Sequence, residues 1–163
     1  MGSIDDLLKN AERYAEDFPH GDLRRPPVRK LAVVACMDSR LNPNNLLGLR
    51  EGDAHIIRNA GGIIAEDEIR SLAISQHLMG TEAIILLHHT DCGMLTFDDE
   101  EFATKLEAEA GQRPTWEGQA FTDLEEDMRE SLSRVRTSPF IPHRDQVRGF
   151  IYEVETGVLR EVA

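Results

Sequence analysis

Positively charged residues are scarce in this 163-residue chain. Lysine and arginine number 18 against 30 aspartates and glutamates, which gives a formal net charge of −12. Nucleic acid and anionic membrane surfaces are bound through clustered basic residues, so we expect the chain to bind neither. The excess of acid does not exclude a small anionic substrate, because the local field of a site can differ from that of the whole molecule. The acidic segment 98–128 is interpreted as a solvated helical face.

Long hydrophobic runs are also missing. No apolar segment approaches the roughly 20 residues of a membrane-spanning helix. The beginning of the chain, MGSIDDLLKNAERYAEDF, is acidic and amphipathic and lacks the basic start and apolar core of a signal peptide. We therefore expect a cytoplasmic protein. Because 40% of the residues are hydrophobic and no repeat or linker divides the sequence, residues 1–163 are predicted to form a single domain.

Cysteine is limited to Cys36 and Cys92. In a reducing compartment a disulfide between them is the less favoured use, and metal binding or catalysis is favoured instead. A thiol redox protein is an alternative interpretation, in which the two cysteines form a disulfide and no metal binds. The chain has no Cys-x-x-Cys pair, which argues against this alternative.

Short apolar, β-branched runs alternate with segments of helical periodicity along the chain. Strands are predicted at residues 31–36, 54–58, 82–89, 146–155 and 158–162, and helices at 3–17, 66–79 and on either side of 111–118. This alternation predicts an α/β fold with a mainly parallel central β-sheet flanked by helices. The last two strands turn at residues 155–157, so the sheet should include a C-terminal antiparallel edge strand.

Two cysteines and a histidine lie at the ends of predicted strands. Cys36 ends the first strand within VVACMDSR, and His89 ends the third within LLHHTDCG, three residues before Cys92. Because ligands of such sheets bind beyond the carboxyl ends of the strands, the three side chains meet if these two strands are neighbours. Two thiolates and an imidazole suit zinc, and three protein ligands leave a fourth position for water. The adjacent His88 points to the opposite face of a continuing strand and is predicted to be a packing or hydrogen-bonding residue.

Asp38 and Arg40 lie close in sequence to the first predicted zinc ligand. The Asp38 carboxylate can occupy the fourth position on the metal and close the site, or it can pair with the Arg40 guanidinium and leave that position to water. The two residues are therefore predicted to gate the access of water to the metal. A simpler interpretation is that MDSRLNP begins a helix, with Asp38 or Ser39 capping its free backbone amides.

The runs CMDSR, RNAGG and HTDCG together resemble the β-class carbonic anhydrase family, whose marks are Cys-x-Asp-x-Arg and a later His-x-x-Cys. The resemblance implies a mainly parallel sheet flanked by helices and the zinc-dependent, reversible hydration of carbon dioxide to bicarbonate and a proton. It implies that Cys36, His89 and Cys92 hold Zn²⁺. By the same resemblance, Asp38 and Arg40 form the dyad beside the metal.

The resemblance also extends to assembly and to the substrate pocket. It implies a homodimer or larger homo-oligomer, with the N-terminal helix within residues 1–17 packed on the neighbouring subunit. The backbone of Ala60, Gly61 and Gly62 is implied to line the pocket, and His88 departs from the family pattern, in which glycine is common at this position. Relatives with the same zinc motifs hydrolyse carbonyl sulfide or carbon disulfide. Such a hydrolase, and a non-catalytic zinc-binding or bicarbonate-sensing protein, are therefore alternative functions.

Overall fold

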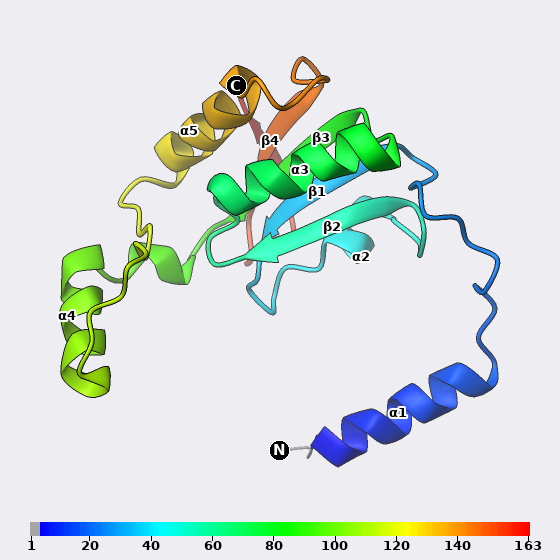
Figure 1. The fold of residues 1–163 in the computed structure, drawn as a ribbon, viewed down its shortest axis with the longest axis horizontal. Helices are drawn as coiled ribbons and strands as arrows, with labels where there is room; N and C mark the ends of the chain where they lie inside the picture. The colour runs from blue at the N-terminus through cyan, green and yellow to red at the C-terminus, as the bar shows by residue number, and fades with distance from the viewer. Residues whose placement is uncertain (1–3) are drawn as a thin grey trace.

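The structure is a computed structural model that describes residues 4–163, and it is built around one central sheet (Figure 1). The strands are β1 (Leu31–Cys36), β2 (Ala54–Asn59), β3 (Ala83–His89), β4 (Val147–Tyr152) and β5 (Leu159–Val162). The helices are α1 (Ile4–Glu16), α2 (Pro43–Leu47), α3 (Glu66–Met79), α4 (Asp99–Ala110) and α5 (Leu124–Thr137), with a short 3₁₀ helix η1 (Gly93–Leu95).

The sheet has the strand order β2-β1-β3-β4-β5. The first four strands run parallel to one another, and β5 pairs antiparallel with β4 at the edge. The predicted fold class is confirmed. Every residue of β1 is buried, as expected for a central strand that is covered on both faces. Because β1 and β3 are direct neighbours, their carboxyl ends lie at the same edge of the sheet.

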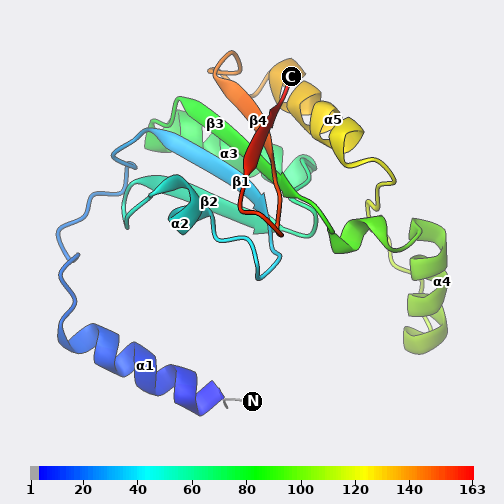
Figure 2. The same cartoon turned by 180° about the vertical axis from the view of Figure 1, so that it is seen from behind.

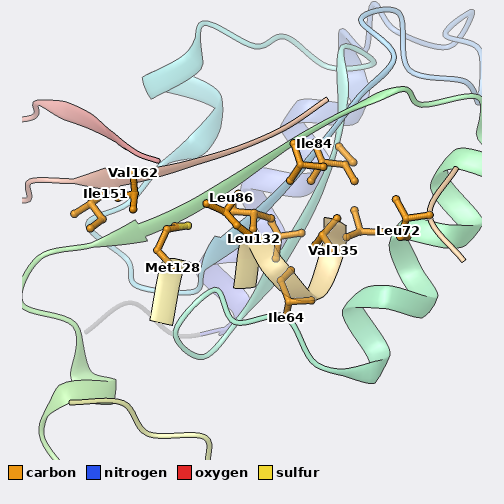
Figure 3. Close-up of a cluster of buried hydrophobic side chains, with 13 residues drawn as sticks. Ile64, Leu72, Ile84, Leu86, Met128, Leu132, Val135, Ile151 and Val162 are labelled. Carbon is orange, nitrogen blue, oxygen red and sulfur yellow. The ribbon is translucent and has the colours of Figure 1, made fainter. Parts of the chain in front are cut away.

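Helices α3 and α5 cover one face of the sheet (Figures 1 and 2). Leu72 of α3 and Leu132 of α5 meet Leu86 of the central sheet in a cluster of buried aliphatic side chains (Figure 3). A glycine on β4 makes room for α5, because a Cβ at Gly149 would lie 2.5 Å from the sulfur of Met128. The other face is covered by α2 and by loops, around a second buried cluster that contains both cysteines.

Helix α2 was anticipated only by the alternative interpretation of MDSRLNP as a helix start, and it begins later than that interpretation placed it, with Asn42 and not Asp38 or Ser39 as its cap. Its local signals are nevertheless clear. The side chain of Asn42 caps the first turn by accepting a hydrogen bond from the backbone N–H of Asn45, and Pro43 occupies the first position. Gly48 ends the helix in the left-handed conformation, with φ of 63°.

Helices α1 and α4 stand away from the sheet (Figures 1 and 2). Helix α1 agrees with the predicted helix 3–17, although residue 3 lies outside the described residues. It has no buried residue, and its apolar side chains Ile4, Leu7 and Leu8 are 75%, 65% and 56% exposed. Within residues 4–163, no helix combines the length and the hydrophobicity needed to cross a lipid bilayer.

Candidate metal centre

Cys36, His89 and Cys92 converge at the carboxyl ends of β1 and β3. Cys36 is the last residue of β1, His89 is the last residue of β3, and Cys92 directly precedes η1. One ligand atom from each residue lies within 4.8 Å of the other two, and all three residues are buried. The neighbouring strands therefore assemble the three predicted zinc ligands at one point.

The distance between the two sulfurs matches a shared metal and not a disulfide. The Sγ atoms of Cys36 and Cys92 are 4.0 Å apart, and both thiols are free. A disulfide would bring them to about 2.05 Å. Two sulfurs that each lie about 2.3 Å from one tetrahedral zinc are roughly 3.8 Å apart. The redox alternative therefore has no support in this geometry.

The imidazole of His89 is oriented as a metal ligand. Its Nδ1 lies 2.8 Å from the carbonyl oxygen of Thr90, which can only accept, so Nδ1 carries the hydrogen. Nε2 of the neutral ring is then left with a lone pair. This Nε2 is buried without a hydrogen-bond partner among the described residues. A buried acceptor without a partner beside two thiols fits a metal ion at this position.

The electrostatics of the group favour a cation. The hydrogen bond from the Cys92 thiol lowers the pKa of the Cys36 thiol well below its usual range, with a smaller contribution from His89. The same hydrogen bond raises the pKa of Cys92. Burial opposes protonation of His89, but the hydrogen bond to the Thr90 carbonyl and the nearby charges of Cys36 and Asp38 raise its pKa overall. Anionic sulfur, an imidazole and a carboxylate at one point form a suitable donor set for a divalent metal.

Asp38 lies next to this group and is paired with Arg40. The guanidinium donates from Nε to Oδ1 at 3.0 Å and from Nη2 to Oδ2 at 2.8 Å, and the backbone N–H of Arg40 donates to Oδ1 at 2.8 Å. These bonds hold the pKa of the Asp38 carboxyl well below its usual range. Oδ2 is also 3.7 Å from Nε2 of His89, so the carboxylate lies close to the three metal-ligand atoms.

Two further residues fix the dyad, and the sequence analysis did not single out either. Asp91 accepts a hydrogen bond from Nη1 of Arg40 at 2.7 Å through its carboxylate, and its carbonyl accepts from Nη2 at 2.9 Å. Arg58 of β2 donates to the carbonyl oxygens of Cys36, Asp38 and Leu41, all at 3.0 Å or less. The guanidinium of Arg58, an exposed residue, therefore holds the loop that carries Cys36, Asp38 and Arg40.

A cavity of about 570 Å³ opens onto the metal-ligand group. Ala60 and Gly61 line it together with Cys36, Asp38 and Cys92, and their role in substrate binding stays a prediction. Gly62 is not among the lining residues. It is packed beneath them, where an added Cβ would lie 2.7 Å from the backbone nitrogen of Cys36 and 2.8 Å from the carbonyl oxygen of Leu87.

Comparison with known proteins agrees with this geometry. The sequence profile of the carbonic anhydrase family matches residues 31–159. The β-carbonic anhydrase 1 of Mycobacterium tuberculosis is 52% identical over 162 residues, which is 99% of each chain. This chain belongs to the β-carbonic anhydrase family. The crystal structure of the carbonic anhydrase from Streptococcus mutans superposes with a TM-score of 0.92 at 42% identity, covering 100% of this chain and 99% of that one. A carbon disulfide hydrolase of an Acidianus species is 36% identical over 97% of this chain and 88% of its own.

The departure at His88 from the glycine common in β-carbonic anhydrases has a structural role outside the metal centre. Strand alternation sends His88 to the face covered by α5 while His89 faces the thiols, as predicted. His88 is fully buried, and its Nε2 lies 3.2 Å from the carbonyl oxygen of Gly62. Its ring is stacked on Phe121 with centroids 6.0 Å apart. Burial lowers the pKa of His88 to about 4, so the ring is neutral at pH 7.

Proposed function

We propose that this protein is a zinc enzyme that hydrates carbon dioxide reversibly to bicarbonate and a proton. The observation that carries the proposal is the convergence of ligand atoms from Cys36, His89 and Cys92 within 4.8 Å of one another, next to a cavity that Cys36 and Cys92 help to line. Membership of the β-carbonic anhydrase family supports the same reaction. The cytoplasm is the proposed compartment, because free thiols persist there.

In this mechanism Cys36, His89 and Cys92 would hold Zn²⁺ through their two sulfurs and one imidazole nitrogen. Zinc lowers the pKa of a bound water toward about 7, so it supplies a nucleophile near neutral pH. The Asp38 carboxylate accepts a hydrogen bond from the attacking water and orients the oxygen lone pair toward the carbon of carbon dioxide. A carbon–oxygen bond forms, one carbonyl π pair moves onto oxygen, and one water proton leaves, which gives bicarbonate and a proton.

Arg40 positions Asp38 for this role and keeps it from the metal. We propose that the Asp38 carboxylate would close the site if it left Arg40 and served as a further ligand to the ion that Cys36, His89 and Cys92 would hold. The two thiolates would already balance the charge of Zn²⁺, so a third anionic ligand would compete with hydroxide. Hydration activity should therefore rise with pH, and a rate that is flat from mildly acidic to alkaline pH would contradict the gate. Arg40→Ala should favour the closed site, and full activity in that variant would reject its assigned role.

Metal analysis combined with stopped-flow carbon dioxide hydration tests the proposed function. The purified protein should contain one zinc per chain and should be active. Cys92→Ser should lose both zinc and activity, whereas Asp38→Asn should keep zinc and lose most of its activity. Zinc without turnover in the unmodified protein would favour the non-catalytic alternative, and protein that binds no zinc would refute the proposal.

A carbonyl sulfide or carbon disulfide hydrolase is the second candidate function. It is favoured by the 36% identity to a carbon disulfide hydrolase and by the apolar side chains that line the cavity, among them Met94 and Phe97. The reaction uses the same ligands and the same attacking water, so only the substrate differs. Parallel assays with carbon dioxide, carbonyl sulfide and carbon disulfide separate the two functions by their kcat/KM values.

We further propose that the protein is a homodimer or larger homo-oligomer in which α1 packs on the neighbouring subunit. The support is the row of exposed apolar side chains on α1, which monomers in water rarely leave uncovered. Light scattering should give at least twice the mass of 18.3 kDa. Leu7→Glu together with Leu8→Glu should reduce that mass, and an unchanged assembly would refute this role of α1.

A further inference from the structure

Three aromatic side chains line the cavity that opens onto the candidate metal centre. Phe97, Phe102 and Trp116 line the same cavity as Cys36 and Cys92. Phe97 and Phe102 have ring centroids 5.3 Å apart at a tilt of 60°, and Phe102 and Trp116 have centroids 6.4 Å apart at 50°. The three rings thus form one continuous surface, called here the aromatic wall.

The aromatic wall is held in place by the residues that surround it. The carboxylate of Asp99, at the start of α4, accepts hydrogen bonds from the backbone N–H groups of Gln119 at 2.9 Å and Ala120 at 2.8 Å. Gly118 allows this close return of the chain, because a Cβ there would lie 2.8 Å from Asp99 Oδ1 and 3.3 Å from the ring of Phe97. Arg113, in the segment after α4, forms an ion pair with the Glu100 carboxylate of α4 at 2.5 Å. Phe102 and Trp116 therefore belong to a segment whose two ends are bonded to each other.

The chemistry of the cavity selects uncharged molecules. Its charged lining side chains are the acids Asp38 and Glu117, and most of the remaining lining is apolar or aromatic. An anion such as bicarbonate is repelled there, whereas an uncharged, linear, polarizable molecule gains contact with the rings. Contacts between sulfur and aromatic rings contribute about 0.3–1.5 kcal/mol.

We propose that Phe97, Phe102 and Trp116 form the substrate-binding surface of this site, which holds uncharged linear molecules beside the metal ligands and holds sulfur-containing ones more tightly than carbon dioxide. This inference rests on the proposed function for its substrate class. It adds to that function the specificity-determining residues, which are carried by a segment outside the sheet. Trp116 contributes from an accessible position, because 59% of its surface is exposed.

Carbon disulfide tests the aromatic wall directly in the zinc-loaded protein. Trp116 is the only tryptophan of the chain, so its fluorescence reports on the wall. Carbon disulfide should change the emission along a saturating curve and should inhibit carbon dioxide hydration competitively. Phe102→Ala should raise the half-saturating concentration about three- to tenfold, in line with the loss of one ring contact. Phe140→Ala is the matched control, because it removes an exposed ring far from this cavity and should leave both constants unchanged.

Steady-state kinetics provide a second test that does not depend on the folding of the Phe102 variant. Trp116→Ala should raise KM for carbon dioxide about two- to fivefold with kcat unchanged, because the wall binds substrate without touching the reacting atoms. Two results would overturn the proposed role of the aromatic wall while leaving carbon dioxide hydration intact. One is quenching of the Trp116 fluorescence by carbon disulfide that is collisional and does not saturate. The other is a fall in kcat of Trp116→Ala at constant KM. Saturable binding of carbon disulfide by a protein without hydration activity would instead refute the proposed function alone.

Discussion

Replacing Asp127 by Asn should make the folded protein more stable at alkaline pH. Asp127 lies on α5 with its side chain only 16% exposed, and its Oδ2 has no hydrogen-bond partner among the described residues. The nearest histidine nitrogen, Nε2 of His88, is 3.4 Å away but belongs to a ring that is neutral at pH 7. Burial, together with the neighbouring charge of Glu130, raises the pKa of Asp127 from 3.8 to about 6.

The sign and size of the effect follow from this pKa. A carboxyl group whose pKa is raised in the folded state favours folding at pH values below its pKa in the unfolded chain. That contribution is lost as the pH rises through its pKa in the folded protein. The shift from 3.8 to about 6 corresponds to a cost of roughly 3 kcal/mol at pH 8 and about half of that at pH 5. Asn cannot ionise, so the variant escapes this cost. The stability gained on replacement should therefore be up to about 1.5 kcal/mol larger at pH 8 than at pH 5.

Urea unfolding of both proteins at pH 5 and pH 8, at one protein concentration, measures this difference. The comparison between the two pH values isolates the charge from any constant change in packing or hydrogen bonding caused by the amide. Asp145→Asn is the control, because it removes the same charge from an exposed position. An equal change in the free energy of unfolding at both pH values, or a variant that is less favoured at pH 8 than at pH 5, would refute the reasoning.

Three further predictions concern the support of the metal centre. Arg58→Met should leave three carbonyl oxygens without their donor, lower the free energy of unfolding by about 2–4 kcal/mol and reduce hydration activity at least tenfold, as measured by urea unfolding and stopped-flow assay. Gly62→Ala should lower the free energy of unfolding, measured by urea unfolding, by more than about 2 kcal/mol, because its Cβ would meet Cys36 and Leu87 at a φ of +72°. The control Gly111→Ala has a φ of +69° and no atom within 4 Å of the added Cβ, so it should lower that free energy by only about 1 kcal/mol. Removal of zinc by a chelator should lower Tm by several degrees and its return should restore it, and a Tm that is the same with and without metal would contradict binding at this point.

Much of the fold could be predicted from the sequence because its central strands and α3 have strong local signals. The continuous apolar run 31–36 became β1 with the same bounds, and the helix predicted at 66–79 was confirmed with the same bounds as α3. Acids in its first turn and Gly80 after its last residue mark these ends by dipole and capping effects. The last strands were shorter than predicted, because β4 ends at Tyr152, before the turn begins.

The metal-ligand group was predictable because its residues lie at or just after the ends of predicted strands. Parallel neighbours end at one edge, so Cys36 and His89 had to meet once β1 and β3 were adjacent. The role of Arg58 could not be predicted in this way, because its three acceptors are backbone carbonyls that leave no side-chain pattern. Trp116 was equally hidden, since its place over the cavity depends on how the segment after α4 folds back. The run GQRPTWEG signalled only a break between helices.

The two sulfurs and the imidazole come from neighbouring strand ends and a following loop, so the unfolded chain has no preformed metal-binding site. Binding of the proposed zinc ion should thus be thermodynamically linked to completion of the central sheet, so that the affinity for the ion becomes part of the folding free energy. Newly made protein in a metal-poor environment should therefore be the form most exposed to proteolysis, and zinc supply should set how much of the chain survives.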